Sequence, residues 1–483
     1  MGLFFRASRN ILFKAIAEIF SRAIYLLFFL YLARKLGDRA FGIFSFAFSF
    51  AGIFAVLVDP GLNLLLTRDI AANKAQAQEY TGTISALKLV FAAITLALST
   101  VSIVVLEHDR ETVIVVVSMS ILAICNAFME FQSALFNAFE RMEYDAILKI
   151  TNKILVSLLG SLALYFGCNV RGVTNVMMAA TGLSALFGFY LIQAKFFSVR
   201  LTLRWSASRK LLWNAFPVAL MMIFTVVYYK IDIVLMSQVG LPQEEIGWYA
   251  ASSRLIEMLN VIPGLVVGGL FPILSTLISA EKEKLRDIAS KIHQILLISI
   301  VPVIVTFTWR ANDVISFFYG SDYASSASTL RILVWATLFF FPNFLFMNLF
   351  FILNFQRLNA IFAAGAVVFN IMLNLIILPR YGFLGAGIAR VLSEVALFLC
   401  YAFSAVKYLP QMPLARLALK PVASGVLMAA IFAGFAKQQF HVVLPLGMLA
   451  YVAAVLFLKT FSAGDYATAR QYMKNLILRE GKS

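Results

Sequence analysis

The chain has 483 residues, of which 61% are hydrophobic and only 13% are charged, and its mean hydropathy is +0.88. Soluble domains are about 45–50% apolar and about 25% charged, so this composition excludes a water-soluble fold, which could not bury so much apolar surface. The net charge of +16 could indicate nucleic acid as a partner. The basic residues lie in short breaks between apolar runs, however, and this placement argues against nucleic-acid binding.

Apolar runs long enough to cross a bilayer as helices follow one another along the whole chain. They are continuous rather than alternating, which excludes a transmembrane β-barrel in practice. We therefore predict an all-α integral membrane protein of about fourteen transmembrane helices. The predicted spans are 11–34, 41–65, 82–106, 112–138, 146–166, 172–194, 211–238, 246–278, 288–308, 328–354, 358–378, 384–406, 418–437 and 441–460.

Lysine and arginine are distributed unequally between the two sides of this predicted topology. The loops on the side of the N-terminus hold 25 of them, against 8 on the other side. Because cytoplasmic loops carry the excess of basic residues, both termini are predicted to be cytoplasmic. The first span is not expected to be a cleavable signal peptide, since it is long and carries Lys14, Glu18 and Arg22.

The widest cytoplasmic break, about 195–210, reads FSVRLTLRWSASRK over most of its length and divides six helices from eight. We interpret it as an interfacial linker lying on anionic headgroups; a solvated loop is the alternative. The predicted organisation is an N-terminal six-helix lobe (1–197), this basic linker (198–210), a second six-helix lobe (211–410), and two extra helices with an amphipathic tail that anchors at the membrane surface (411–483).

The two lobes show a weak internal repeat. LGDRAFGIFSFAFSF, from Leu36, leads to DPGL at 59–62, and GLPQEEIGWYAASSR, from Gly240, leads to IPGL at 262–265. Repeats of the same orientation are related by an axis along the membrane normal. We therefore expect the lobes to superpose by rotation about such an axis, with Asp59 falling near Gly264.

Charged residues inside the spans are the candidate functional residues, because each costs about 2.5–3.5 kcal/mol at the bilayer centre. So many must line water or pair with one another, and ion-paired contacts between helices are the structural alternative. They are Glu18, Arg22, Asp59, Lys88, Glu130, Lys153, Lys230, Asp232, Arg254, Glu257, Arg331, Arg390 and Glu394. Three pairs lie one turn apart: Glu18 with Arg22, Arg254 with Glu257, and Arg390 with Glu394. Lys230 and Asp232 point to different faces and need other partners.

No enzyme signature is present in the sequence. His108, His293 and His441 lie far apart, and HExxH, GxSxG and a phosphate-binding GxxxxGK[ST] loop are all missing. Cys125, Cys168 and Cys400 show no metal-ligand spacing and are expected to be packing residues. We therefore predict no catalytic residue, no metal site and no cofactor apart from a coupling ion.

Three segments resemble one known family. ARKLGDRAFGIFSFAFSF followed by DPGL and TRDIA, NAFPVALMM with YYKIDIVLM, and YGFLGAGIARVLSEV resemble segments of polysaccharide-biosynthesis flippases of the Wzx type. These belong to the multidrug/oligosaccharidyl-lipid/polysaccharide exporter superfamily. The resemblance covers almost the whole chain. It implies two six-helix bundles around a central cavity, and transport of an undecaprenyl-diphosphate-linked oligosaccharide across a bacterial inner membrane. The implied partners are this lipid-linked glycan, membrane lipids, and a glycan polymerase or assembly proteins.

The predicted mechanism is alternating access. A cationic cavity formed by Arg22, Lys88, Lys230 and Arg254 would bind the diphosphate, for which the planar arginine fork is suited. The residues proposed for coupling to H⁺ or Na⁺ are Glu18, Asp59, Asp232, Glu257, Arg390 and Glu394. Two alternatives stay open: a drug/cation antiporter of the same superfamily, which would need an acidic or apolar cavity, and a membrane glycan polymerase or ligase, whose large outer-face loop is missing here.

Overall fold

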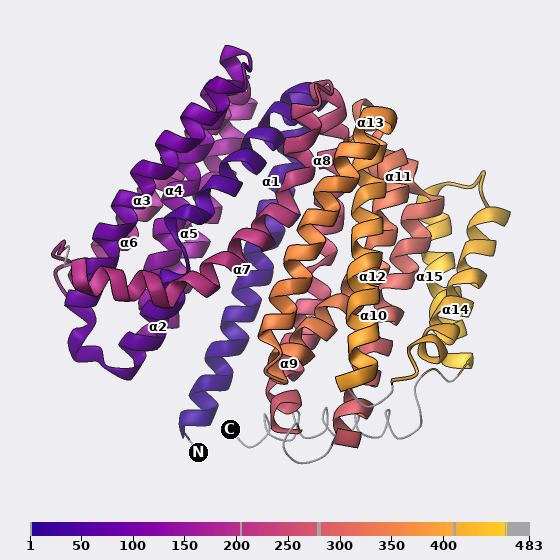
Figure 1. The fold of residues 1–483 in the computed structure, drawn as a ribbon. Coiled ribbons are helices and arrows are strands. Elements are labelled where there is room, and N and C mark those ends of the chain that lie inside the picture. Colours follow the sequence, from indigo (N-terminus) through magenta and orange to yellow (C-terminus); the bar gives the residue numbers. More distant parts are fainter. Residues whose placement is uncertain (1, 203–204, 278–281, 409–411, 459, 461–483) are drawn as a thin grey trace. The chain divides into compact units, whose positions relative to one another are not determined.

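The computed structural model describes residues 2–202, 205–277, 282–408, 412–458 and 460, and within its helices the side chains of residues 2–23 and a few others are not described. All regular elements in these ranges are helical, which confirms the predicted all-α class. The helices up to residue 240 are α1 (Gly2–Ala55), α2 (Leu62–Ala72), α3 (Ala77–Val105), α4 (Arg110–Ala138), α5 (Met142–Tyr165), α6 (Val170–Lys195) and α7 (Trp205–Gln238) (Figure 1).

The remaining helices are α8 (Gln243–Leu259), α9 (Val261–Leu277), α10 (Lys282–Trp309), α11 (Ala311–Phe318), α12 (Ser326–Ile352), α13 (Gln356–Tyr408), α14 (Leu414–Gly434) and α15 (Phe440–Phe457). Three short 3₁₀ turns, η1 (Val56–Val58), η2 (Lys74–Gln76) and η3 (Ser321–Tyr323), lie between helices. The predicted amphipathic tail lies outside the described residues.

Twelve helical stretches in the described residues are long and apolar enough to cross a membrane. Two of them contain a break. α1 is interrupted at Gly37 (φ 75°) and α13 at Gly382 (φ 55°), conformations that glycine adopts without the strain of a Cβ atom. These two helices, α1 with 54 residues and α13 with 53, are long enough for two crossings each, so the twelve stretches are compatible with the fourteen predicted spans. α8 and α9 together form the single span predicted over 246–278.

One predicted boundary is wrong. The span predicted over 41–65 ends early, because Pro60 lacks a backbone N–H and Gly61 is left-handed (φ 82°). α2 then begins as a separate helix, and the Asp59 carboxylate accepts the Asn63 backbone N–H at 3.1 Å near its start. The break between the spans predicted over 288–308 and 328–354 is confirmed, since α10 ends at Trp309 and α12 begins at Ser326, and it contains α11 and η3.

The chain forms two compact units. The first comprises Met1–Ala251, Ser316–Ser326 and Ala363–Ala389. α4 is central in it and packs against α1, α3, α5 and α6, and α3 to α6 run side by side in Figure 1. Apolar residues of α2 to α7 form one core in this unit, in which Phe131 and Phe136 are fully buried. α7 has Pro217 in its interior, and prolines at such positions bend helices.

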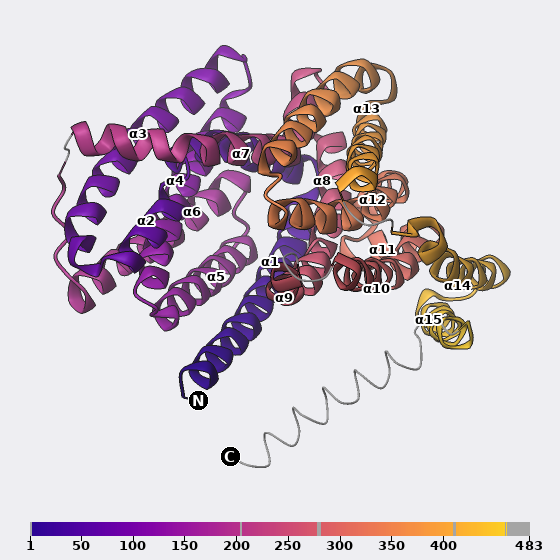
Figure 2. The ribbon, with the colours of Figure 1, turned by 60° about the horizontal axis from the view of Figure 1, so that its bottom comes forward.

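The second unit comprises Ser252–Ile315, Ala327–Phe362 and Arg390–Ser483. α9, α10, α12 and the last part of α13 share one core, where the rings of Phe346, Phe350 and Phe362 lie 5.2–6.3 Å from that of Tyr401. α14 and α15 pack together and onto α10 through a smaller apolar cluster, as both ribbon views show (Figures 1 and 2). The predicted lobe boundaries and the predicted superposition of the lobes stay predictions.

Candidate functional site

A buried polar cluster surrounds Asp232 of α7 in the first unit. Asp232 is only 3% exposed, and its carboxylate accepts one hydrogen bond from the Tyr249 hydroxyl at 2.8 Å and another from Asn374 Nδ2 at 2.8 Å. Asn374 also donates to the side-chain oxygen of Asn370 at 3.2 Å, one turn earlier on α13. Asn370 and Asn374 are fully buried. Three helices thus converge on one carboxylate that is kept from water.

The oxygen atoms of this cluster are the kind that bind a hard cation or a proton. The Asn374 Oδ1 atom is buried and has no hydrogen-bond partner among the described residues. The Asp232 carboxylate, Asn370 Oδ1 and Asn374 Oδ1 all contribute oxygen atoms to the cluster, and oxygen ligands are those that hard cations prefer. The sequence singled out Asp232, whereas its asparagine and tyrosine partners could be found only from the packing of α7, α8 and α13.

Lys230 lies two residues before Asp232 on α7 and points to a different face of the helix, as the spacing of the two residues predicted. Its ammonium lies 4.2 Å from the ring centroid of Phe48 on α1, a cation–π contact. Gly52 makes room for it, because a Cβ atom at that position would stand only 2.6 Å from Lys230 Cε. Lys230 is half-buried.

Lys88 and Asp59, assigned different roles from the sequence, form one ion pair. Lys88 Nζ lies 3.5 Å from Asp59 Oδ1, 3.5 Å from the Ala127 carbonyl oxygen and 5.6 Å from the Phe131 ring centroid. The Lys88 side chain is 0% exposed and that of Asp59 is 14% exposed. In this structure the pair ties α3 to the break before α2. The predicted contact of Lys88 with cargo stays a prediction.

In the second unit, two of the helical-spacing pairs form as predicted. Arg254 Nη1 lies 3.0 Å from Glu257 Oε2, and Arg390 Nε lies 3.7 Å from Glu394 Oε1. Glu394 also accepts a hydrogen bond from Asn343 Nδ2 at 3.0 Å and is 1% exposed, whereas the Arg254 side chain is 25% exposed. The side chains of Glu18 and Arg22 lie outside the described part of the structure. The water-filled space predicted for Arg22, Lys230 and Arg254 stays a prediction.

A glycine-mediated crossing of α1 and α8 was not predicted from the sequence. A Cβ atom on Gly42 would overlap the Gln243 carbonyl oxygen, and one on Gly247 would overlap the Asp38 carbonyl oxygen. Each glycine thus faces the carbonyl four residues before the other. Trp248 Nε1 donates to Asp38 Oδ2 at 2.9 Å beside this contact. The feature of the sequence that could have indicated this contact is the internal repeat, in which LGDRAFG and GLPQEEIG occupy equivalent positions.

Because the opposing atoms at this crossing belong to the backbone, no side-chain rearrangement can make room there. We expect Gly247→Val to force α1 and α8 apart while the protein still inserts into the membrane. Spin labels on Arg39→Cys and Glu244→Cys, whose side chains approach to 3.9 Å in the native protein, should report a longer distance. Gly268→Val is the matched control, because a Cβ atom there meets nothing within 4 Å. An unchanged label distance in Gly247→Val would contradict this prediction.

Comparison with known proteins identifies the family. The profile of the family described as "Polysaccharide biosynthesis protein" matches residues 7–278, more than half of the chain. A putative O-antigen transporter of Shigella flexneri is 23% identical over 378 residues, 74% of this chain and 88% of that protein. The probable low-salt glycan biosynthesis flippase Agl15 of Haloferax volcanii is 22% identical over 382 residues, 78% of this chain and 79% of that protein.

Solved structures share the fold. The lipid II flippase MurJ in an inward closed conformation has a TM-score of 0.74 and 16% identity, over 93% of this chain and 99% of that one. An inward-facing multidrug resistance transporter of the MATE family in the MOP superfamily has a TM-score of 0.63 and 18% identity, over 82% of this chain and 94% of that one. The resemblance found in the sequence is thereby confirmed. The chain belongs to the polysaccharide biosynthesis protein family.

Proposed function

We propose that this chain is a flippase that moves an undecaprenyl-diphosphate-linked oligosaccharide or polysaccharide repeat unit across the bacterial inner membrane by alternating access. The observation that carries the proposal is the family match over residues 7–278, on a chain whose described residues include twelve helical stretches long and apolar enough to cross a membrane. The names of two relatives, an O-antigen transporter and a glycan biosynthesis flippase, support it. The proposed partners are a lipid-linked glycan, membrane lipids, and a glycan polymerase or assembly proteins.

The distribution of accessible charge supports an anionic cargo. Lys230 is half-buried and the Arg254 side chain is 25% exposed, so neither side chain is fully enclosed within its own unit. Arginine binds phosphate oxygens through two parallel hydrogen bonds, which a lysine cannot reproduce. We assign diphosphate binding to Arg22, Lys230 and Arg254, and electrostatic moderation of their charge to Glu18 and Glu257.

We expect Arg254→Ala to lower glycan export by about ten- to a hundredfold, because a charge-assisted hydrogen bond contributes about 1.5–3 kcal/mol. Arg254→Lys should restore part of the loss, since it keeps the charge but not the fork. Arg22→Ala and Arg22→Lys should behave in the same way. Export is measured as cell-surface glycan per amount of membrane-inserted protein. If alanine lowers only the amount of folded protein, the arginines are structural.

The proposed orientation places both termini in the cytoplasm, on the basis of the distribution of basic residues. Reporter fusions after Lys210 and after Lys482 are both expected to give a cytoplasmic signal. A periplasmic signal from either fusion would contradict the proposed topology.

The function is tested by deleting the gene and following the lipid-linked glycan. We expect the glycan to accumulate in the inner leaflet and to be missing from the cell surface, and the wild-type gene to reverse both effects. The MATE-family neighbours make a drug/cation antiporter the second candidate. Deletion of an antiporter would change drug sensitivity and leave the glycan unaffected, whereas loss of a polymerase would shorten the exported glycan without trapping it inside.

A further inference from the structure

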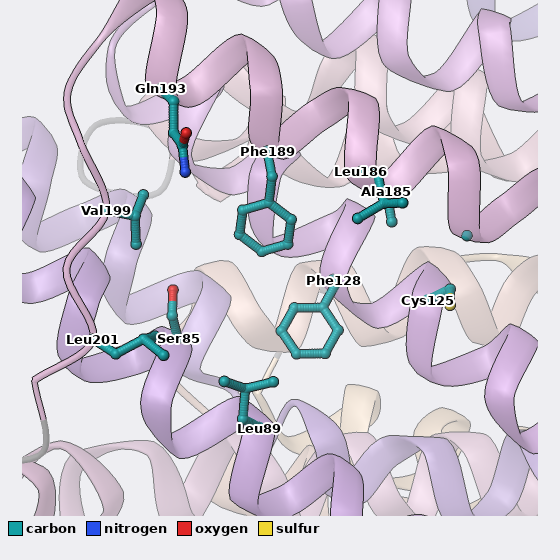
Figure 3. A pocket seen from close by; sticks show the side chains of 11 residues that line it. Ser85, Leu89, Cys125, Phe128, Ala185, Leu186, Phe189, Gln193, Val199 and Leu201 are labelled. Atoms are coloured by element: carbon teal, nitrogen blue, oxygen red, sulfur yellow. The ribbon is translucent and has the colours of Figure 1, made fainter.

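A groove on the first unit has no role in the proposed cycle. It lies between α3, α4 and α6 and is closed at one end by residues 199–201 of the linker (Figure 3). Its volume is about 450 Å³, within the range of about 300–1,000 Å³ typical of small-ligand sites. The lining residues are Ser85, Leu89, Cys125, Phe128, Gly182, Ala185, Leu186, Phe189, Gln193, Val199 and Leu201.

The groove changes character along its length. At one end the Phe128 and Phe189 rings lie 6.0 Å apart, and Leu89 and Leu186 are exposed beside them. Ser85 and Gln193 lie at the other end, near the linker (Figure 3). An apolar chain is therefore accommodated at the first end and a polar group at the second.

Ser85 points to the chemistry of this polar group. It is only 3% exposed, and its hydroxyl has no hydrogen-bond partner among the described residues. Figure 3 shows the hydroxyl directed towards the space beside Val199 and Gln193. A buried hydroxyl without a partner costs free energy, so an acceptor atom supplied by a ligand would stabilise the site.

The linker at this end is held firmly and carries positive charge. The side chain of Gln78 donates to the Ser198 carbonyl at 2.9 Å, the Thr83 and Thr202 hydroxyls lie 3.3 Å apart, and Gly82 allows the Arg200 carbonyl to approach α3. Lys195 and Arg200 are exposed, and residues 195–210 include no acidic residue. Such a segment attracts the anionic headgroups of the cytoplasmic leaflet.

We propose that this groove is a binding site for an anionic glycerophospholipid. One acyl chain lies along Leu89, Phe128 and Leu186, the ester carbonyl accepts a hydrogen bond from the Ser85 hydroxyl, and the headgroup phosphate lies near Lys195 and Arg200. A polyprenyl diphosphate, by contrast, has no ester carbonyl for Ser85. The bound lipid would fasten the linker to α3, independently of any cargo.

The test uses the three native cysteines of the purified full-length protein in detergent. Cys125 lines the groove, whereas Cys168 and Cys400 are exposed elsewhere. Maleimide labelling of each cysteine is followed by mass spectrometry with added phosphatidylglycerol, phosphatidylcholine or polyprenyl phosphate. Phosphatidylglycerol is expected to slow labelling of Cys125 at least fivefold and to leave Cys168 and Cys400 unchanged, with phosphatidylcholine much less effective.

Variants test whether the protection of Cys125 from labelling arises from lipid bound in the groove. Gly182→Leu is expected to abolish it, because a Cβ atom there meets only Cys125 Sγ, at 3.9 Å, and a larger side chain enters the groove. Gly365→Leu is the control, since a Cβ atom there meets nothing within 4 Å. Ser85→Ala should reduce the protection of Cys125 by phosphatidylglycerol several-fold. The double variant Lys195→Gln/Arg200→Gln should make phosphatidylglycerol protect Cys125 no better than phosphatidylcholine does.

Three results would overturn the proposal: protection that survives Gly182→Leu, equal protection by phosphatidylcholine, or stronger protection by polyprenyl phosphate. The last would instead make the groove part of the path of the cargo.

Discussion

Replacement of Asp232 by asparagine is expected to abolish ion-coupled glycan export while the protein folds and inserts normally. The substitution keeps the size of the side chain and its acceptor oxygen, so the hydrogen bond from the Tyr249 hydroxyl at 2.8 Å can persist. It removes the charge that would bind a proton or a sodium ion. Asp232 is 3% exposed and surrounded by asparagine and tyrosine side chains, so binding a cation there would neutralise a buried charge, which is otherwise costly.

The measurement is glycan export in inverted vesicles under an imposed H⁺ or Na⁺ gradient. The wild-type protein should respond to one of the two gradients, and Asp232→Asn to neither. Asn374→Ala should weaken the response, because it removes the buried Oδ1 atom. Asp145→Asn is the matched control, since Asp145 is also buried but pairs with Lys149. Gradient-driven export by Asp232→Asn at the wild-type rate would refute this role.

The largest expected effect on stability is at Lys88. Lys88→Met keeps the length of the side chain but leaves Asp59 facing the core without its ammonium partner at 3.5 Å. Breaking a buried ion pair by removing one partner costs about 3–5 kcal/mol. We expect a loss of this size in the free energy of unfolding, measured by chemical denaturation in detergent micelles.

The double variant Lys88→Met/Asp59→Asn should recover most of that loss. Asparagine removes the charge and keeps a side-chain oxygen acceptor, so the contact with the Asn63 backbone N–H can be kept. Arg68→Met is a control, because its 2.7 Å pair with Asp69 is exposed and such pairs contribute about 0–1 kcal/mol. If Lys88→Met unfolds at the wild-type denaturant concentration, the pair does not stabilise the fold.

The sequence alone determined features that depend on local spacing and on composition. The apolar runs predicted the all-α membrane class and the approximate number of spans, because span length follows from bilayer thickness. The pairs Arg254–Glu257 and Arg390–Glu394 could be predicted because residues three or four apart share one face of a helix, whatever surrounds it. The family, too, could be recognised from loose segments of sequence.

Only the tertiary structure decided which helices meet. Asp232 and Asn374 are 142 residues apart, and their contact depends on how α7 and α13 pack. Lys88 and Asp59 could not be paired from the sequence, because the pair requires the break before α2 to face the middle of α3. The reciprocal contacts of Gly42 and Gly247, and the groove beside Ser85, have the same origin. A sequence pattern shows which face of a helix is apolar, but that face could pack against many other apolar faces. Only the shapes of the packed side chains select one partner.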